Sequence, residues 1–125
     1  MGYYTNYSIR VVPKERGYRF SDGYFNLLDN EDFEDMSYQM GEALHEINPN
    51  YFSNGYCLQD QIDNEAMKWY DYAEDMTALS KKFPEYLFVL SGDGEDQDDI
   101  WFAYFLNGKS QLAMAEITFE DCTLC

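Results

Sequence analysis

Apolar residues recur along this chain with two different periods. Steps of three and four residues, typical of the buried face of a helix, occur twice. The first set is Phe33, Met36, Met40, Leu44 and Ile47, and the second is Tyr72, Met76, Leu79 and Phe83. These patterns predict two helices, the first ended by Asn48-Pro49 and the second by Pro84.

Side chains suited to helix N-termini precede both predicted helices. Asp29 or Asn30 can cap the first, and the carboxylates that follow favour the positive end of its dipole. Asp71 and Glu74 have the spacing of an Asp-x-x-Glu capping box for the second. Gly41 lowers the helix propensity in the middle of the first helix.

Segments rich in β-branched and aromatic residues predict strands between and after the helices. These segments are 3–12, 66–70, 86–90, 100–106 and 110–119, and residues 56–58 are a further candidate. The apolar run 86–90 is typical of a central strand, and Gly92-Asp93-Gly94 is expected to break it. Asn107-Gly108 is a hairpin turn signal. The predicted order is β-α-β-α-β-β-β.

This order predicts an α+β fold in which two helices pack on one face of a mainly antiparallel sheet. The length favours a single domain over residues 1–125. Apolar residues make up 46% of the chain and aromatic residues 18%, which separates it from disordered acidic segments. The chain shows no signal-peptide pattern, no membrane-spanning apolar run and no disulfide framework, so we expect a soluble cytoplasmic protein.

Charge is the most unusual property of the sequence. Twenty-four acidic residues against eight basic ones give a net charge of −16. Residues 1–20 sum to +3, so they form a basic strand and loop before an acidic body of −19 over residues 21–125. Sixteen charges correspond to about 27 Å of duplex DNA, close to the expected width of the folded chain. Such a protein repels nucleic acid and attracts proteins that bind nucleic acid.

The acidic residues gather in three segments that we expect to contact a partner. The first choices are Asp29, Glu31, Asp32, Glu34 and Asp35 with Asp93, Glu95, Asp96, Asp98 and Asp99, and the second choice is Asp60, Asp63 and Glu65. Ordinary solubility needs a net charge of only about 2–8 in magnitude, so helix caps and solubilising side chains explain the total poorly. Exposed tyrosines beside carboxylates suit protein binding. The tyrosine candidates are Tyr3, Tyr4, Tyr7, Tyr18 and Tyr24.

Metal binding and catalysis have weaker support in the sequence. The acidic loop after Asp93 lacks the Gly and Glu that an EF-hand needs at its sixth and twelfth positions. Cys122 and Cys125 have zinc-ligand spacing, and Cys57 and His45 could complete four ligands; free thiols are the alternative. His45 also suits a capping or packing role near the end of the first helix. No nucleophile or cofactor motif is evident, so we expect a protein that is not an enzyme.

Several short motifs stand out between residues 67 and 109. They are Met67-Lys68-Trp69-Tyr70-Asp71, Glu74-Asp75-Met76, Leu79-Ser80-Lys81-Lys82-Phe83-Pro84, Leu90-Ser91-Gly92, Asp99-Ile100-Trp101 and Tyr104-Phe105-Leu106-Asn107-Gly108-Lys109. These motifs resemble a segment of small acidic phage and mobile-element proteins of unassigned activity. In size and charge the whole chain is also similar to DNA-mimic anti-CRISPR and anti-restriction proteins.

The resemblance implies a stoichiometric phage inhibitor, acting in the cytoplasm of the infected bacterium. Its partner would be a host nucleic-acid-binding protein, a CRISPR effector or a restriction enzyme, rather than nucleic acid or a membrane. Two other classes stay open. One is an antitoxin or immunity-type protein that neutralises a basic toxin, and the other is a metal-dependent enzyme that uses the acidic loop.

Overall fold

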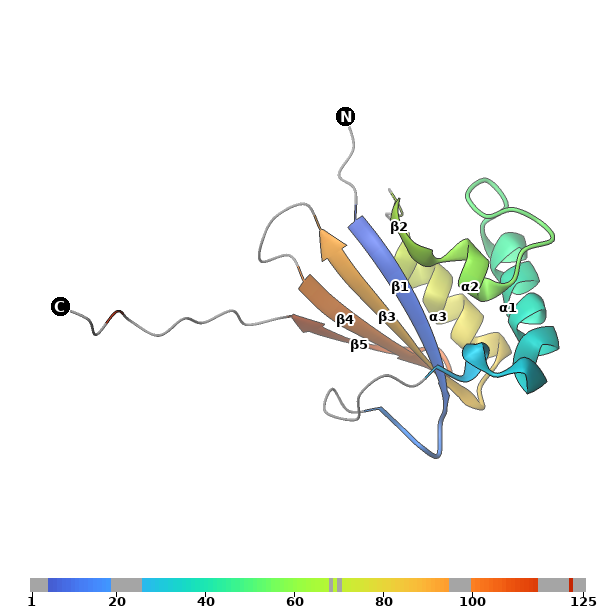
Figure 1. Cartoon of the computed structure of the whole chain (residues 1–125), viewed down its shortest axis with the longest axis horizontal. Coiled ribbons are helices and arrows are strands. Elements are labelled where there is room, and N and C mark those ends of the chain that lie inside the picture. The colour runs from blue at the N-terminus through green and yellow to red at the C-terminus, as the bar shows by residue number, and fades with distance from the viewer. Residues whose placement is uncertain are drawn as a thin grey trace.

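An antiparallel sheet runs through the computed structural model, which describes residues 5–18, 26–67, 69, 71–94, 100–114 and 122, with the backbone alone for 63–67. Within these residues the sheet has five strands (Figure 1). In spatial order they are β2 (Asp63–Met67), β1 (Thr5–Pro13), β3 (Tyr86–Gly94), β4 (Ile100–Leu106) and β5 (Lys109–Met114). The apolar strand β3 therefore lies in the middle of the sheet, as its composition predicts.

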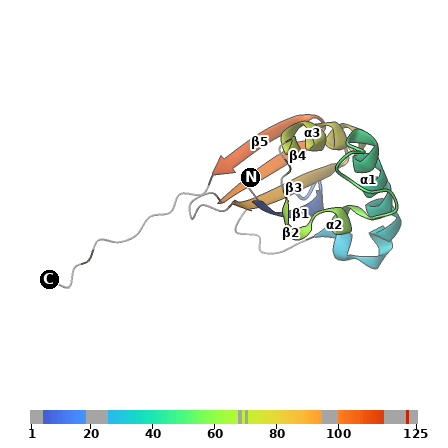
Figure 2. The ribbon, with the colours of Figure 1, turned by 90° about the horizontal axis from the view of Figure 1, so that it is seen from above.

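Three α-helices are present in the described part of the chain. They are α1 (Glu34–Ile47), α2 (Leu58–Gln61) and α3 (Tyr72–Lys82), and two 3₁₀ turns, η2 (Leu27–Asp29) and η3 (Glu31–Phe33), lead into α1. Figure 2 shows the helices gathered on one side of the sheet. The predicted α+β class with an antiparallel sheet is confirmed. The short helix α2 was not predicted. It begins at Leu58, within the segment 56–58 that was a candidate strand.

The core fills the space between the helices and one face of the sheet. On β1 the side chains that point to the helices alternate with more exposed ones. The four that point to the helices are buried, and they are Thr5, Tyr7, Ile9 and Val11. From the helix side, Met40 and Leu44 of α1 and Met76 and Leu79 of α3 are fully buried. The three- and four-residue steps in the sequence therefore mark the faces that are removed from water.

The opposite face of the sheet is partly covered by the segment that follows β1. Tyr18 lies with its ring 6.0 Å from the ring of Tyr104 and 6.4 Å from that of Phe102, both on β4. Its hydroxyl accepts a hydrogen bond of 2.7 Å from Arg10 on β1. Val89 of β3 pairs with Arg10 on this face and is also buried. Aromatic residues of β4 thus divide between two faces, rather than all joining the helix-side core.

Local signals in the sequence are confirmed at the last turn and wrong at two other places. Asn107 and Gly108 have φ values of 48° and 81°, the left-handed conformation of a tight hairpin between β4 and β5. Gly92 does not break β3, which continues through Asp93 and has Gly94 as its last residue. Asp71 occupies the N-cap position of α3 but makes no capping side-chain hydrogen bond, so the predicted capping box is absent.

No helix in the described part of the chain combines the length and the apolar composition needed to cross a membrane.

Candidate acidic protein-binding site

The start of α1 presents the first predicted acidic group. Asp29 lies in η2, Glu31 and Asp32 lie in η3, and Glu34 and Asp35 occupy the first turn of α1. All five side chains are exposed. Asn30 caps η3, because its Oδ1 accepts a hydrogen bond of 3.1 Å from the amide of Asp32. The carboxylates therefore stand where the unpaired backbone amides of the helix start favour negative charge.

A buried asparagine fixes this acidic segment to the sheet. The Oδ1 of Asn26 accepts hydrogen bonds from the amides of Val11 at 3.2 Å and Leu28 at 3.1 Å, and its Nδ2 donates to the carbonyl of Ile9 at 3.3 Å. β2 pairs with β1 only over residues 5–8 of β1. Beyond that pairing, the side chain of Asn26 forms hydrogen bonds with the backbone groups of Ile9 and Val11 at this edge of β1. The sequence analysis missed Asn26, since nothing local marks an asparagine that pairs with a strand 15 residues away.

A glycine on α1 brings α2 alongside it. The backbone of Tyr56, Cys57 and Leu58 lies against Gly41, and a Cβ at this position would collide with the carbonyl of Tyr56. Without a side chain at Gly41, the chain can approach the helix closely enough for α2 to begin beside it. Gly41, which lowers helix propensity, therefore has a packing role in the assembly of the site.

The elements η2, η3, α1 and α2 line an open hollow of about 410 Å³, which we call the acidic hollow. Its described lining residues are Leu28, Asp29, Asn30, Glu31, Glu34, Ser37, Tyr38, Cys57, Gln59 and Asp60. Four of these carry carboxylates, and none of the ten is basic. The Nε2 of Gln59 donates a hydrogen bond of 2.9 Å to Asp29 Oδ1, which ties α2 to η2 across the hollow.

The structure joins some of the predicted acidic residues and separates others. Asp60, a second choice in the sequence, lies with Asp29, Glu31 and Glu34 around the acidic hollow, whereas Asp32 and Asp35 are exposed beside it. Asp93 pairs with Asn6 near the start of β1, away from the Ile9–Val11 region that Asn26 holds. Asp93 is therefore not one of the described residues that line the acidic hollow.

The remaining predicted acidic residues are only partly covered by the structure. Asp63 and Glu65 lie in β2, where their backbones pair with Ser8 and Tyr7, and their side chains are outside the description. Glu95, Asp96, Asp98 and Asp99 lie outside the described residues. The proposed contact between the loop after β3 and a partner thus stays a prediction.

Tyrosines on the surface differ from the ones that the sequence suggested. Tyr7 is only 4% exposed and donates its hydroxyl proton to the carbonyl of Trp69, so its predicted exposure is wrong. Tyr18 is half-buried, and Tyr3, Tyr4 and Tyr24 lie outside the described residues. Among the tyrosines that the structure describes, the exposed ones are Tyr38, Tyr51 and Tyr56. Of these, Tyr38 stands in the acidic hollow beside the carboxylates.

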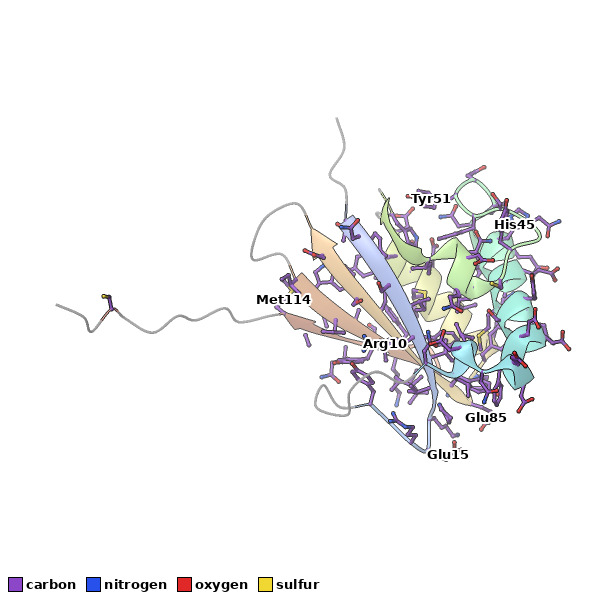
Figure 3. All side chains as sticks on the ribbon, viewed as in Figure 1. Arg10, Glu15, His45, Tyr51, Glu85 and Met114 are labelled. Atoms are coloured by element: carbon purple, nitrogen blue, oxygen red, sulfur yellow. The ribbon has the colours of Figure 1, made fainter. Side chains whose placement is uncertain are left out.

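His45 has a structural partner. Its Nδ1 donates to the carbonyl of Phe52 at 2.6 Å, which holds the loop after α1 against the helix; Figure 3 shows His45 and Tyr51 on the same side of the molecule. Cys57 lines the acidic hollow, Cys122 is exposed, and Cys125 lies outside the described residues. Within the described ranges, no three His, Cys, Asp or Glu side chains are arranged to hold a metal ion.

The ion pairs between described residues lie elsewhere on the surface. Lys14 pairs with Glu85 at 3.8 Å, and Lys82 pairs with Glu46 at 3.6 Å. Both pairs are largely exposed and so add little stability. Figure 3 shows Glu15 and Glu85 together at the end of the molecule where β1 ends and β3 begins. No described cation forms an ion pair with the carboxylates of the acidic hollow.

Comparison with known proteins gives no match to a protein-family model, to a curated protein sequence or to a solved structure.

Proposed function

We propose that this protein is a phage-encoded inhibitor of a host defence system. It binds the basic nucleic-acid-binding surface of a CRISPR effector or restriction enzyme, and its carboxylates take the place of DNA phosphates. One observation carries the proposal: a net charge of −16 on 125 residues, with the exposed carboxylates at the start of α1 not neutralised by any described cation.

Electrostatics explains how such a surface would act. A concentrated negative potential raises the association rate with a basic protein, and its effect falls as salt screens the charges. Carboxylates three or four residues apart on a helix lie about 5–6 Å from each other, near the spacing of successive phosphates. Arg and Lys of the partner would form charge-assisted hydrogen bonds with them. Tyr38 adds an amphipathic ring to the same surface.

Displacement of DNA tests this function directly. A fluorescent duplex is bound to purified CRISPR effectors and restriction enzymes, and its anisotropy is followed as the protein is added. We expect stoichiometric loss of DNA binding for one target, with an affinity that weakens steeply between low and moderate salt. An affinity for the protein partner that salt leaves unchanged would contradict charge mimicry. Capture of a single small basic toxin instead would favour the immunity-type alternative.

Matched variants separate the site from net charge. The site variant neutralises five carboxylates at the start of α1: Asp29→Asn, Glu31→Gln, Asp32→Asn, Glu34→Gln and Asp35→Asn. The control neutralises five exposed carboxylates outside all three predicted groups: Glu15→Gln, Glu42→Gln, Glu46→Gln, Asp71→Asn and Glu74→Gln. We expect the site variant to lose about ten-fold or more in inhibition, and the control much less. Equal losses would mean that net charge alone acts, with no defined site.

A further inference from the structure

We infer that the acidic hollow binds one arginine side chain of the protein partner. The inference rests on the proposed function, because that function requires a partner with a basic surface. It adds a defined contact, a guanidinium seated between η2, α1 and α2, to a surface that otherwise acts through its overall potential.

The carboxylates around the hollow come from separate elements and converge on one space. Asp29 is contributed by η2, Glu31 by η3, Glu34 by α1 and Asp60 by α2. Because no described lining residue is basic, this concentration of negative charge has no internal counter-charge. A guanidinium is a donor-only cation with five N–H groups in a plane, so it can serve several acceptors at once. An ammonium is a compact point charge and fits such a spread of acceptors less well.

A second observation is independent of the acidic side chains. Ser37 lines the hollow and is only 4% exposed, and its Oγ has no hydrogen-bond partner among the described residues. Buried hydroxyls are nearly always paired, so an unpartnered one points to a missing ligand or water. The Ser37 hydroxyl turns about a single side-chain torsion and can accept an N–H from a cation in the hollow.

Two further lining residues suit the rest of an arginine side chain. Leu28 provides a buried apolar wall against which the methylene stem can pack. Tyr38 is 42% exposed, so its ring is open to stacking by a planar guanidinium. The hollow therefore offers an apolar wall, an aromatic face and a set of acceptors.

The walls are held in place by contacts that need no ligand. The Gln59–Asp29 hydrogen bond of 2.9 Å links α2 to η2, and the Gly41 contact sets α2 beside α1. Asn26 fixes η2 to β1. A site whose walls are already in position loses less conformational entropy when it binds.

The test uses the complete chain and a small probe, N-acetyl-arginine-N-methylamide, titrated by NMR. We expect saturable shifts of the Ser37, Tyr38 and Gln59 amide signals, with a dissociation constant on the order of 1 mM. N-acetyl-citrulline-N-methylamide has nearly the same shape without the charge and should give no saturable shift. The lysine analogue should bind more weakly. Equal binding of citrulline, or tighter binding of lysine, would overturn the assignment to arginine.

Variants at the hollow have a matched control on the same helix. Glu34→Gln should weaken arginine binding about five-fold, and Glu42→Gln, which removes the same charge outside the hollow, should leave it unchanged. Ser37→Ala should weaken binding without lowering the unfolding temperature, because the hydroxyl makes no hydrogen bond in the free protein. A fall in the unfolding temperature with unchanged arginine binding would assign Ser37 to packing and overturn its role.

The same variants distinguish this inference from the proposed function. Displacement of DNA by wild type together with no saturable arginine shift would overturn the arginine site and leave the inhibitor function standing. Arginine binding that is lost in Glu34→Gln, with no displacement of DNA from any target, would support the arginine site and count against the inhibitor function.

Discussion

The indole N–H of Trp69 donates a hydrogen bond of 2.8 Å to Oδ2 of Asp75, and both residues are buried. The same oxygen accepts a second hydrogen bond of 2.9 Å from Nδ2 of Asn48, at the end of α1. Trp69 accepts at its own carbonyl from the Tyr7 hydroxyl at 3.0 Å. The Asp75 carboxylate thus links the end of α1 to Trp69, and the Trp69 carbonyl links this pair to Tyr7 of β1. Burial of a carboxylate is costly without such donors, so these hydrogen bonds are what make this position tolerable.

Loss of the Asp75 carboxylate should destabilise the fold. We expect Asp75→Ala to lower the free energy of unfolding by about 2–3 kcal/mol, because the buried indole N–H of Trp69 and the half-buried amide of Asn48 lose their acceptor. Urea denaturation followed by Trp fluorescence measures the change. Glu74→Ala, on the same turn but exposed, should stay close to wild type. Equal stabilities for the two variants would mean that the buried hydrogen bonds contribute nothing.

Gly41→Ala should be destabilising even though alanine is the better helix former. Alanine gains about 1 kcal/mol in helix propensity, but the new Cβ meets the Tyr56 carbonyl and must push α2 away from α1. We expect a lower unfolding temperature and weaker arginine binding at the acidic hollow. Gln39→Ala, at an exposed position of α1, is the control and should retain both properties. A more stable Gly41→Ala variant would contradict the close approach of the loop.

Gly92→Ala should disturb the pairing of β3 with β4. Gly92 lies opposite Trp101, and a Cβ there would enter the space of the Trp101 ring. We expect a cost of about 1–3 kcal/mol and an altered near-ultraviolet circular dichroism signal from Trp101. The side chain of the neighbouring Ser91 points to the other face of the sheet, so Ser91→Ala should leave that signal intact. An unchanged spectrum for Gly92→Ala would show that the ring does not pack over this glycine.

Alkaline pH should destabilise the protein through Tyr104. Burial raises the pKa of Tyr104 above its ordinary value of 10.0, and the neighbouring Tyr18 raises it further. Above that value the unfolded chain releases the phenol proton before the folded chain does, so the free energy of unfolding falls as pH rises. Tyr104→Phe removes this contribution, and its stability should fall less between about pH 9 and 11. The free energy of unfolding is measured by urea denaturation at each pH. An equal fall with pH in wild type and Tyr104→Phe would contradict the role of Tyr104.

Local patterns were sufficient for several elements of the fold. The apolar steps that predict α1 and α3 reflect the period of a helix, which the chain carries in any environment. Asn107-Gly108 is confirmed as a turn because the two residues tolerate the left-handed conformation that a tight hairpin needs. The predicted break does not occur at Gly92, because this glycine lies within β3 and makes room for the Trp101 ring instead of forming a turn.

The acidic hollow shows where prediction from the sequence ends. Asp29 to Asp35 were predicted as one group because they are neighbours in the sequence. The inclusion of Asp60 depends on Gly41, which admits the backbone before α2, and on Gln59, which bonds to Asp29 from 30 residues away. The Ser37 hydroxyl is buried without a partner only because the same elements pack around it. No local pattern carries this information, since each contact joins segments that only packing brings together.

The sequence by itself determines the helix and strand periods, the final hairpin and the net charge of −16, because each depends on residue types at short separations or on their total. The tertiary structure decided which carboxylates share a surface, which tyrosines are exposed and which glycines admit a neighbouring chain. These properties follow from contacts between residues far apart in sequence, and such contacts exist only once the helices have packed on the sheet.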